Sequence, residues 1–290
     1  MSLQVGFTGL GAMGAPMSRH LAARGLLVAV ANRTHARAEA LAAELGVAAI
    51  AEPVELARRC EVVVTCVTAD ADVLALCQAY AAAGRAGLVV IDTSTIASTS
   101  ARQAAAVLRA AGGDFIDAPV SGGVEGAKNG KLSVMAGGAA ATLERVRPVL
   151  EAFAARVTHM GDVGAGQDTK AVNQVLVAGI AQAVTEGLAL GQALGLDPAR
   201  LLPTLQAGAA NSWFLEKRGA TMLRDEFSVG FKLALLHKDL KIVRELARDA
   251  GTDTTVIDRA LADYATLIAQ GHGDDDISGL IRLKRARPAS

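Results

Sequence analysis

The chain has few cysteines, few aromatic residues and no net charge. Its three cysteines, Cys60, Cys66 and Cys77, show no CxxC spacing, so neither a disulfide framework nor a zinc cluster is indicated. Twenty-nine basic residues balance 29 acidic ones, which leaves no net field to attract a nucleic acid. Aromatic residues make up 3% of the chain, so the core must consist mainly of alanine, valine and leucine. We therefore expect a globular protein with reduced thiols and no nucleic-acid partner.

Targeting and membrane signals are also missing. The N-terminus lacks the basic start and apolar stretch of a signal peptide. The longest apolar region, 171–196, carries polar residues that a bilayer-spanning helix would rarely contain, namely Asn173, Gln174, Gln182, Glu186 and Gln192. We expect this region to be a buried helix of a cytoplasmic protein that contacts no membrane. The one basic run, 282–287, is expected to be a solvated C-terminal tail.

Two kinds of pattern divide the chain. Up to about residue 162, short β-branched runs alternate with alanine-rich stretches, which is typical of a parallel sheet with crossover helices. The expected strands are 4–8, 27–31, 62–67, 88–92, 115–117, 133–136 and 157–159, and the expected helices include 16–24, 36–45, 98–111 and 141–153. Later the strand signals stop, and helices continue to the C-terminus, the first over about 167–194. The sequence predicts an α/β, doubly wound Rossmann domain, 1–162, joined by a long interdomain helix to an all-α domain, 163–290.

A glycine loop follows the first expected strand and precedes the first expected helix. Gly9, Gly11 and Gly14 match GxGxxG, in which the first glycine permits a tight turn and the second lets the backbone approach a pyrophosphate. The third allows close packing of helix on strand, and the helix N-terminus offers N–H groups and a positive dipole end. The predicted dinucleotide loop is Gly9, Leu10, Gly11, Ala12, Met13 and Gly14. A purely structural glycine turn is the alternative.

The residues after the second expected strand indicate which dinucleotide binds. An Asp or Glu there would bond the ribose 2′-hydroxyl of NAD, but the chain has Asn32, Arg33 and Thr34. These offer hydrogen-bond donors and one fixed positive charge, which suit the 2′-phosphate of NADP. We expect NADP(H) to be preferred and NAD(H) to be possible. The alternative is that Arg33 is an ordinary solvated surface residue.

A second glycine-rich segment, Asp117-Ala-Pro-Val-Ser-Gly-Gly, has features of a carboxylate site. Consecutive amides at Gly122 and Gly123, with the Ser121 hydroxyl, would form a nest for an anion. Ser121 is not expected to be a hydrolase nucleophile, because Pro119 stands where a nucleophile elbow needs glycine. A structural turn is again the alternative.

Lys170 lies near the start of the long helix expected over about 167–194. Lys170, Asn173 and Gln174 stand at i, i+3 and i+4 and therefore project from one helix face. A lysine beside apolar neighbours is costly unless it is paired or used, and desolvation would lower its pKa into the range useful for acid–base work. The alternative is a lysine that extends along the helix to water.

With these segments and Asp92-Thr-Ser-Thr-Ile, the sequence resembles the β-hydroxyacid dehydrogenase family over nearly its whole length. That family includes 3-hydroxyisobutyrate dehydrogenases and tartronate, glyoxylate and succinic semialdehyde reductases. The resemblance implies that Lys170 is catalytic and that Asn173 and Gln174 orient it and the substrate, although which amide orients the substrate stays open. It also implies that Val67, Thr68 and Thr95 line the cofactor and that the substrate contacts Ser121, Gly122 and Gly123.

A later segment, 231–240, resembles the family's Lys-Asp-Leu element. The resemblance implies that Lys238 reaches the cofactor and Asp239 supports the site. It also allows Phe231 and Trp213 to line the pocket, with a core position as the alternative for each. From the residues alone, Lys238 and Asp239 would be only an exposed ion pair.

The resemblance implies hydride transfer between NADP(H) and a small β-hydroxy acid or semialdehyde, with Lys170 as general acid and base. The substrate types are 2-hydroxy-3-oxopropionate, glyoxylate, succinic semialdehyde and 3-hydroxyisobutyrate. No metal is expected, because the five histidines are scattered without ligand spacing. The alternatives are an imine reductase-like NADPH enzyme and a non-catalytic NADP-binding sensor or interaction module. Apolar helices in the second half suggest a homodimer or homotetramer.

Overall fold

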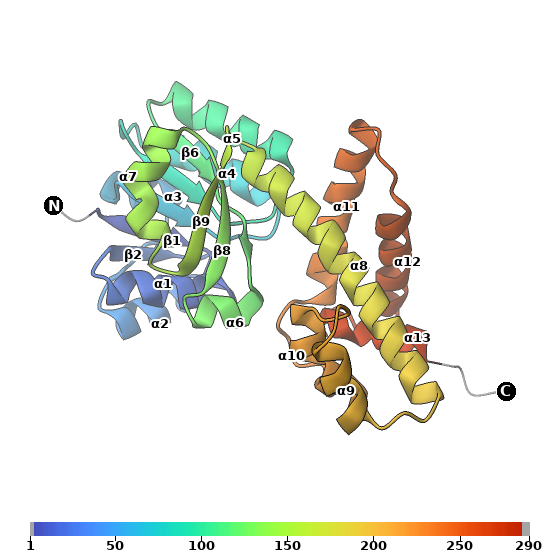
Figure 1. The fold of residues 1–290 in the computed structure, drawn as a ribbon. Helices are drawn as coiled ribbons and strands as arrows, with labels where there is room; N and C mark the ends of the chain where they lie inside the picture. Colours follow the sequence, from blue (N-terminus) through green and yellow to red (C-terminus); the bar gives the residue numbers. More distant parts are fainter. Residues whose placement is uncertain (1–2, 286–290) are drawn as a thin grey trace. The chain divides into compact units, whose positions relative to one another are not determined.

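A computed structural model describes residues 3–285 and divides the chain into two compact units, which meet in the sequence between Lys170 and Ala171 (Figure 1). Helix α8 (Ala165–Ala193) begins in the first unit and ends in the second. The predicted domain boundary, between residues 162 and 163, precedes this helix.

The first unit is built on one mixed sheet. Its strands are β1 (Val5–Thr8), β2 (Leu27–Ala31), β3 (Ala48–Ala49), β4 (Val62–Thr65), β5 (Val89–Asp92), β6 (Asp114–Asp117), β7 (Val120–Ser121), β8 (Leu132–Gly137) and β9 (Ala154–Gly161). The order β3-β2-β1-β4-β5-β6 is parallel throughout, which is the arrangement of a dinucleotide-binding fold. The predicted α/β fold with a helical second half is confirmed.

The far side of the sheet departs from the all-parallel expectation. Strand β8 runs antiparallel to both β6 and β7 and parallel to β9. The prediction was wrong here because β7 has only two residues, too few to show a periodic pattern. Strand β7 lies beside β8 at the end of the strand order and leads directly into α6.

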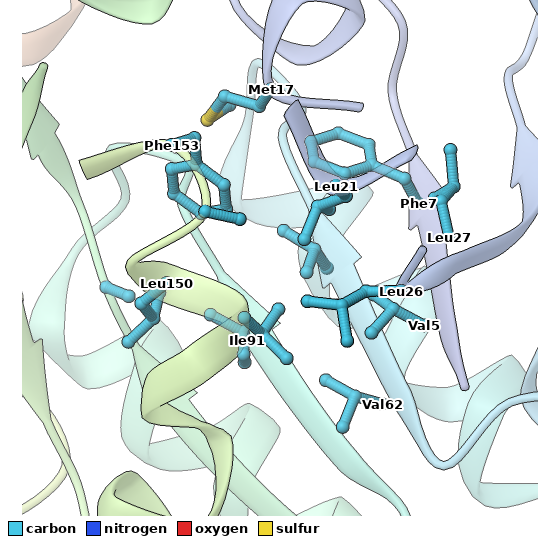
Figure 2. Packing of buried hydrophobic residues seen from close by; sticks show 14 of the residues in the cluster. Val5, Phe7, Met17, Leu21, Leu26, Leu27, Val62, Ile91, Leu150 and Phe153 are labelled. Atoms are coloured by element: carbon cyan, nitrogen blue, oxygen red, sulfur yellow. The ribbon is translucent and has the colours of Figure 1, made fainter. Parts of the chain in front are cut away.

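Helices cover both faces of this sheet. They are α1 (Gly14–Ala23), α2 (His35–Leu45), α3 (Pro53–Arg59), α4 (Asp70–Ala81), α5 (Ser98–Ala110), α6 (Gly123–Lys128) and α7 (Ala140–Leu150). Figure 2 shows one core, in which Val5, Phe7 and Ile91 of the strands lie with Leu21 of α1 and Phe153 after α7. The intervening strand residues pack on the opposite face against α3, α4 and α5. Burial on both faces explains why the strands are continuous hydrophobic runs.

The second unit is entirely helical in its described part. Besides most of α8 it contains α9 (Pro198–Gln206), α10 (Trp213–Leu223), α11 (Leu233–Asp249), α12 (Thr255–Ala269), the 3-10 helix η1 (Ile277–Leu280) and α13 (Ile281–Lys284). Asp197 caps α9, which has proline in its first turn, and the Asp197 side chain accepts a bond from Ala199 N–H. Residues of α8, α10, α11 and α12 share one core.

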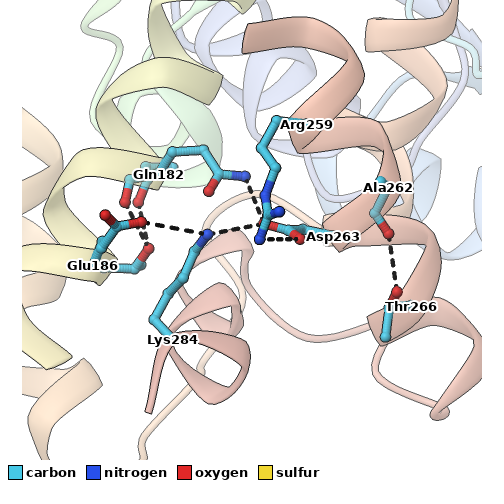
Figure 3. A network of polar contacts seen from close by, with 9 residues as sticks. Gln182, Glu186, Arg259, Ala262, Asp263, Thr266 and Lys284 are labelled. Carbon is cyan, nitrogen blue, oxygen red and sulfur yellow. Dashed lines mark hydrogen bonds and ion pairs between the residues drawn. The ribbon is translucent and has the colours of Figure 1, made fainter. Parts of the chain in front are cut away.

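A buried carboxylate ties three helices of this unit together (Figure 3). Asp263 of α12 accepts hydrogen bonds from Lys284 at 2.9 Å, Gln182 at 3.1 Å and Arg259 at 3.1 Å. Burial raises the pKa of Asp263, but the bonds from Lys284 and Gln182 outweigh it and hold the pKa below its ordinary value. The expected solvated tail at 282–287 is therefore wrong for Lys284, and Arg287 lies outside the described residues.

Helix α8 is only half buried, which corrects the expectation of a buried helix. One face packs into the core, while the other leaves Val172, Leu176, Ile180 and Leu190 exposed, as is Leu194 directly after the helix. Within residues 3–285, α8 is the one helix that is long and apolar enough to span a membrane, and length and composition alone are weak evidence. Its bonds through Gln182 to the buried Asp263 show that its inner face belongs to the protein core.

Candidate active site

The glycine loop between β1 and α1 has the shape that a pyrophosphate needs. Gly9 has φ +96°, and a Cβ there would lie 2.2 Å from the Cys66 carbonyl oxygen. A Cβ on Gly14 would lie 1.9 Å from the Gly9 oxygen, so the helix packs directly on the turn. A Cβ on Gly11 would meet nothing within 4 Å, and the first turn of α1 carries no acidic residue. The loop therefore has open space over a positive helix end, which fits a dinucleotide.

Asn32 has a structural task in this loop. Its Oδ1 accepts a hydrogen bond from Leu10 N–H at 2.9 Å, and its Nδ2 donates to the Thr34 carbonyl at 3.0 Å. The side chain thus braces the glycine loop against the turn after β2. Arg33 is 92% exposed, and its guanidinium lies 3.9 Å from the Asp72 carboxylate.

The ends of β4 and β5 are joined by side chains. Val67 N–H donates to Ser94 Oγ at 2.9 Å, and Thr65 Oγ1 donates to Asp92 Oδ1 at 2.7 Å. Because β1, β4 and β5 are neighbours in the sheet, the loops after them share its carboxyl edge, where such folds bind their ligands. Thr68 is exposed and Thr95 half-buried on these loops.

The predicted carboxylate nest lies where β7 turns into α6. Gly122 and Gly123 have φ values of +129° and +61°, which side-chain-bearing residues rarely adopt. Ser121 ends β7 and is half-buried. Glycine is therefore favoured at both positions, and the backbone beside the serine is partly exposed.

Lys170 reaches this segment from the second turn of α8. The residue is 7% exposed, and its Nζ donates a hydrogen bond to the Val120 carbonyl at 2.9 Å. The ammonium group therefore lies beside the peptide that leads into Ser121. A buried ammonium group in this position could interact with an anion held by the Gly122 and Gly123 amides.

Two residues near Lys170 were missed at the sequence level. Asp117, at the end of β6, is fully buried, and its carboxylate accepts bonds from Gly164 N–H at 2.8 Å and Gln167 N–H at 2.9 Å. It therefore caps the start of α8. Burial raises the pKa of Asp117 to about 7, against the lowering effect of those bonds.

Gln167, the other missed residue, precedes Lys170 by about one helical turn. Its side-chain amide contacts the backbone on both sides of Thr95. The only signal in the sequence was position, since Asp117 ends a strand and Gln167 lies at i−3 from the lysine.

In the second unit, four polar residues form a chain of contacts. Asn173 Nδ2 donates to Gln174 Oε1 at 2.7 Å, and Gln174 Nε2 donates to Asp239 Oδ2 at 2.7 Å. Lys238 Nζ pairs with the other oxygen of Asp239 at 3.0 Å. Gln174 is buried and uses both ends of its amide, whereas Asn173 is half-buried. Asn173 and Gln174, whose roles the sequence did not distinguish, thus have different surroundings.

The two predicted aromatic pocket residues lie elsewhere in this unit. Phe231 N–H donates to Asp276 Oδ2 at 3.0 Å, and its ring packs at the edge of the helical core. Trp213 is half exposed, and the Arg218 guanidinium lies 5.6 Å from its ring centroid. Within residues 3–285, no group of three or more His, Cys, Asp or Glu side chains is placed to hold a metal ion.

Two family models together cover almost the whole chain. Residues 4–161 match the NAD binding domain of 6-phosphogluconate dehydrogenase, and residues 164–284 match the NAD-binding domain of NADP-dependent 3-hydroxyisobutyrate dehydrogenase. With the glycine loop described above, these matches define an NAD(P)-dependent oxidoreductase.

Similar proteins narrow the class. The chain is 38% identical to an uncharacterized oxidoreductase of Shewanella frigidimarina, over 98% of this chain and 99% of the relative. It is 35% identical to an NAD-dependent L-serine dehydrogenase of Pseudomonas aeruginosa, over 97% of each chain. It is 32% identical to 2-hydroxy-3-oxopropionate reductase of Escherichia coli, over 97% of this chain and 96% of the relative.

A solved structure agrees with these relatives. Mycobacterium tuberculosis 3-hydroxyisobutyrate dehydrogenase with L-serine has a TM-score of 0.89 and 34% identity, over 99% of this chain and all of that one. The chain belongs to the β-hydroxyacid dehydrogenase family. An imine reductase of Streptomyces aurantiacus, 24% identical with a TM-score of 0.65 over 98% of this chain and 100% of that one, shares the fold.

Proposed function

We propose that this enzyme interconverts a small β-hydroxy acid and its semialdehyde or keto acid, prefers NADP(H), and uses Lys170 as proton donor and acceptor. The observation that carries the proposal is the bond of 2.9 Å from Lys170 Nζ to the Val120 carbonyl, directly before Ser121. It brings a cation to a turn suited to a carboxylate. Candidate substrates are of the 2-hydroxy-3-oxopropionate, glyoxylate, succinic semialdehyde or 3-hydroxyisobutyrate type.

Each part of the turn has a role in this reaction. Ser121, Gly122 and Gly123 bind the substrate carboxylate through the hydroxyl and the backbone amides. When bound, the dinucleotide supplies or accepts the hydride. Lys170 Nζ gives a proton to the carbonyl oxygen in reduction and takes it from the hydroxyl in oxidation. Its positive charge stabilises the oxyanion that develops in either direction.

We assign different roles to the two amides that follow the lysine. Asn173, at i+3 from Lys170 on the same helix, orients the substrate. Gln174 is a positioning residue, because Asn173 and Asp239 occupy both ends of its amide. From the resemblance to the family, we propose that Lys238 contacts the cofactor and that Phe231 contacts the substrate.

The preference for NADP(H) rests on charge. No acidic residue stands at 32–34 to repel a 2′-phosphate, and Arg33 extends into solvent after β2. One relative is NAD-dependent, and the family model that matches 164–284 is described as that of an NADP-dependent enzyme, so both dinucleotides occur among similar proteins. The glycine loop itself does not discriminate, since it contacts the pyrophosphate that both share.

The decisive experiment follows nicotinamide absorbance over a panel of substrates with both dinucleotides. The panel contains glyoxylate, succinic, tartronate and methylmalonate semialdehydes, 3-hydroxyisobutyrate and serine. Lys170→Ala should abolish turnover while NADPH binding is retained, and Lys131→Ala, which changes an exposed lysine, is the matched control. Unchanged turnover in Lys170→Ala would overturn the mechanism. Imine substrates added to the panel test the alternative reaction.

We also propose that the enzyme self-associates through the exposed face of α8. The exposed Glu186 of this helix pairs with Lys284 at 3.8 Å. Six uncharged exposed residues, the last directly after the helix, follow a 4-3-4-3-4 spacing: Leu176, Ile180, Ala183, Gly187, Leu190 and Leu194. Such a repeat, near 3.5 residues, is that of helices that pair lengthwise. This set is called the α8 stripe below.

The α8 stripe is complementary to itself. Large residues stand at both ends and small ones at the centre, so the order of sizes is the same in both directions. In an antiparallel pair, Leu176 faces Leu194 of a second copy, and Ala183 faces its Gly187. The small central pair lets the two backbones approach closely. A twofold contact between identical chains requires this property, whereas a different partner does not.

A further inference from the structure

Gln167, in the first turn of α8, contacts the loop after β5 through its side chain. It is 3% exposed. Its Nε2 donates to the Ser94 carbonyl at 2.8 Å, and its Oε1 accepts from Ile96 N–H at 3.2 Å. The amide therefore bonds the backbone on both sides of Thr95, in the way that a neighbouring strand would.

The backbone of Gln167 is fixed by a different segment. Its N–H donates to Asp117 Oδ2, and Asp117 opens the segment that carries Ser121. Three residues later on the helix, Lys170 donates to the Val120 carbonyl of that segment. Gln167 thus joins the loop after β5, the carboxylate nest and the lysine helix at one point.

This junction matters because of where the loop lies. The loop after β5 shares the carboxyl edge of the sheet with the glycine loop after β1, and Ser94 bonds the end of β4. Ligands of such sheets bind at this edge, where the strand order reverses. A shift of the loop relative to Lys170 would therefore separate the dinucleotide side of the site from the proton donor.

We propose that Gln167 is a positioning residue that sets the distance between the dinucleotide-binding edge of the sheet and Lys170. The inference rests on the proposed function, since it assigns Lys170 the proton transfer. Hydride and proton must reach the two ends of one carbonyl bond. Misplacement of reacting groups by about 1 Å costs about 100-fold in rate.

The chemistry of the contact restricts the residue. The site needs one donor and one acceptor at the end of a two-carbon stem, which glutamine supplies. Leucine removes both bonds at similar volume and leaves two buried backbone groups without this partner. An ionised glutamate presents a second acceptor to the Ser94 carbonyl, while a protonated glutamate offers an O–H donor and a carbonyl acceptor.

Two variants test the inference. Gln167→Leu should lower kcat about 10- to 100-fold, with the KM for NADPH changed by less than about threefold. Gln167→Glu should approach wild-type kcat at low pH, where its buried carboxyl is protonated, and lose activity as pH rises through its pKa. The wild type and Gln167→Leu both keep the titrating Asp117 beside residue 167, so the transition of Gln167→Glu is the additional one that these two proteins lack. Gln192→Leu and Gln192→Glu, at an exposed position of α8, are the matched controls.

A second measurement needs no substrate. Hydrogen exchange of the Ile96 amide should be several-fold faster in Gln167→Leu than in the wild type, because its acceptor is gone. Hydrogen exchange therefore separates the positioning role of Gln167 from the proposed function. A wild-type enzyme that is inactive on every substrate would contradict the proposed function, and the exchange rate would still test the contact of Gln167 with Ile96. Wild-type kcat in Gln167→Leu, or no pH transition in Gln167→Glu, would overturn the positioning role.

Discussion

Lys170 Nζ donates a hydrogen bond to the carbonyl oxygen of Val120, 50 positions earlier in the chain. The bond brings a cation on the longest helix to the short strand that ends at Ser121. Because Lys170 is buried, its ammonium group is held in one place instead of moving through solvent. The bond joins the start of the helix to the turn that we propose binds the substrate carboxylate.

Arg33 should set the dinucleotide preference. Arg33→Ala removes the cation two residues after β2 and should lower the preference for NADPH over NADH about 10- to 150-fold, as a charge-assisted bond contributes about 1.5–3 kcal/mol. The measurement is the ratio of kcat/KM for the two dinucleotides. Arg37→Ala, at an exposed position of α2, is the control. An unchanged ratio would show that Arg33 does not read the 2′-phosphate.

Asp117 should contribute a pH-dependent stability. Burial raises its folded-state pKa to about 7 from the ordinary 3.8. Between about pH 4 and 7 the folded state therefore keeps a proton that the unfolded state has released, so its contribution to the free energy of unfolding falls as pH rises and is constant above 7. Urea unfolding from pH 4.5 to 8.5 measures this.

The matched variant is Asp117→Asn, which does not titrate. This substitution also replaces one of the two acceptor oxygens by an N–H₂ donor that faces a backbone N–H group. It should lower the free energy of unfolding by about 1–3 kcal/mol. The difference in the free energy of unfolding between the wild type and Asp117→Asn should decrease as pH rises from 5 to 7. A difference independent of pH would mean that Asp117 is ionised throughout.

The α8 stripe should control self-association. Leu190→Glu places a charge opposite Ile180 of the second copy and should convert a dimer to a monomer at micromolar concentration. Light scattering after size-exclusion chromatography gives the mass. Val229→Glu, which adds the same charge at another exposed apolar residue, should leave the dimer intact. A wild-type monomer would refute the proposal at once.

The thiols should be nearly inert in the folded enzyme. Burial raises the pKa of Cys60 and Cys66 to about 11 and that of Cys77 still further. Thiolates are the reactive form, so labelling by iodoacetamide at pH 8 should be about 100-fold slower than in denaturant. Mass spectrometry of timed samples measures the rate. Rapid labelling of the folded enzyme would show that these thiols are accessible and ionised.

Local patterns were sufficient for much of the fold. The two-residue β3 of the parallel sheet was not predicted. The other five parallel strands and the glycine loop could be predicted because buried β-branched runs and GxGxxG are short-range signals. The two-residue β7 could not, since no period exists in so short a segment. Helix α8 was expected to be buried because its apolar residues lie on all sides, and composition does not reveal which face meets the core.

The site residues likewise fall into those that local sequence patterns predicted and those that they did not. Lys170 and the nest of Ser121 stand in recognisable segments, and the contact of Lys170 with Val120 joins them. The tasks of Asp117 and Gln167 could not be predicted, because their partners lie 47 to 73 positions away. Asn32 was expected to face the cofactor, but its amide is committed to Leu10 and Thr34, a choice that only the folded turn determines.

Because Asp117 at the end of β6 caps α8, the stability of the start of this helix depends on the sheet. The N–H of Gln167 in the first turn of α8, and that of Gly164 directly before the helix, both donate to Asp117, at the end of a strand 47 residues before Gly164. That turn should therefore become stable only after β6 has joined the sheet, late in folding. A chain divided between residues 162 and 163 would leave the helix without its cap, so the helical part should fray from its N-terminal end when produced alone.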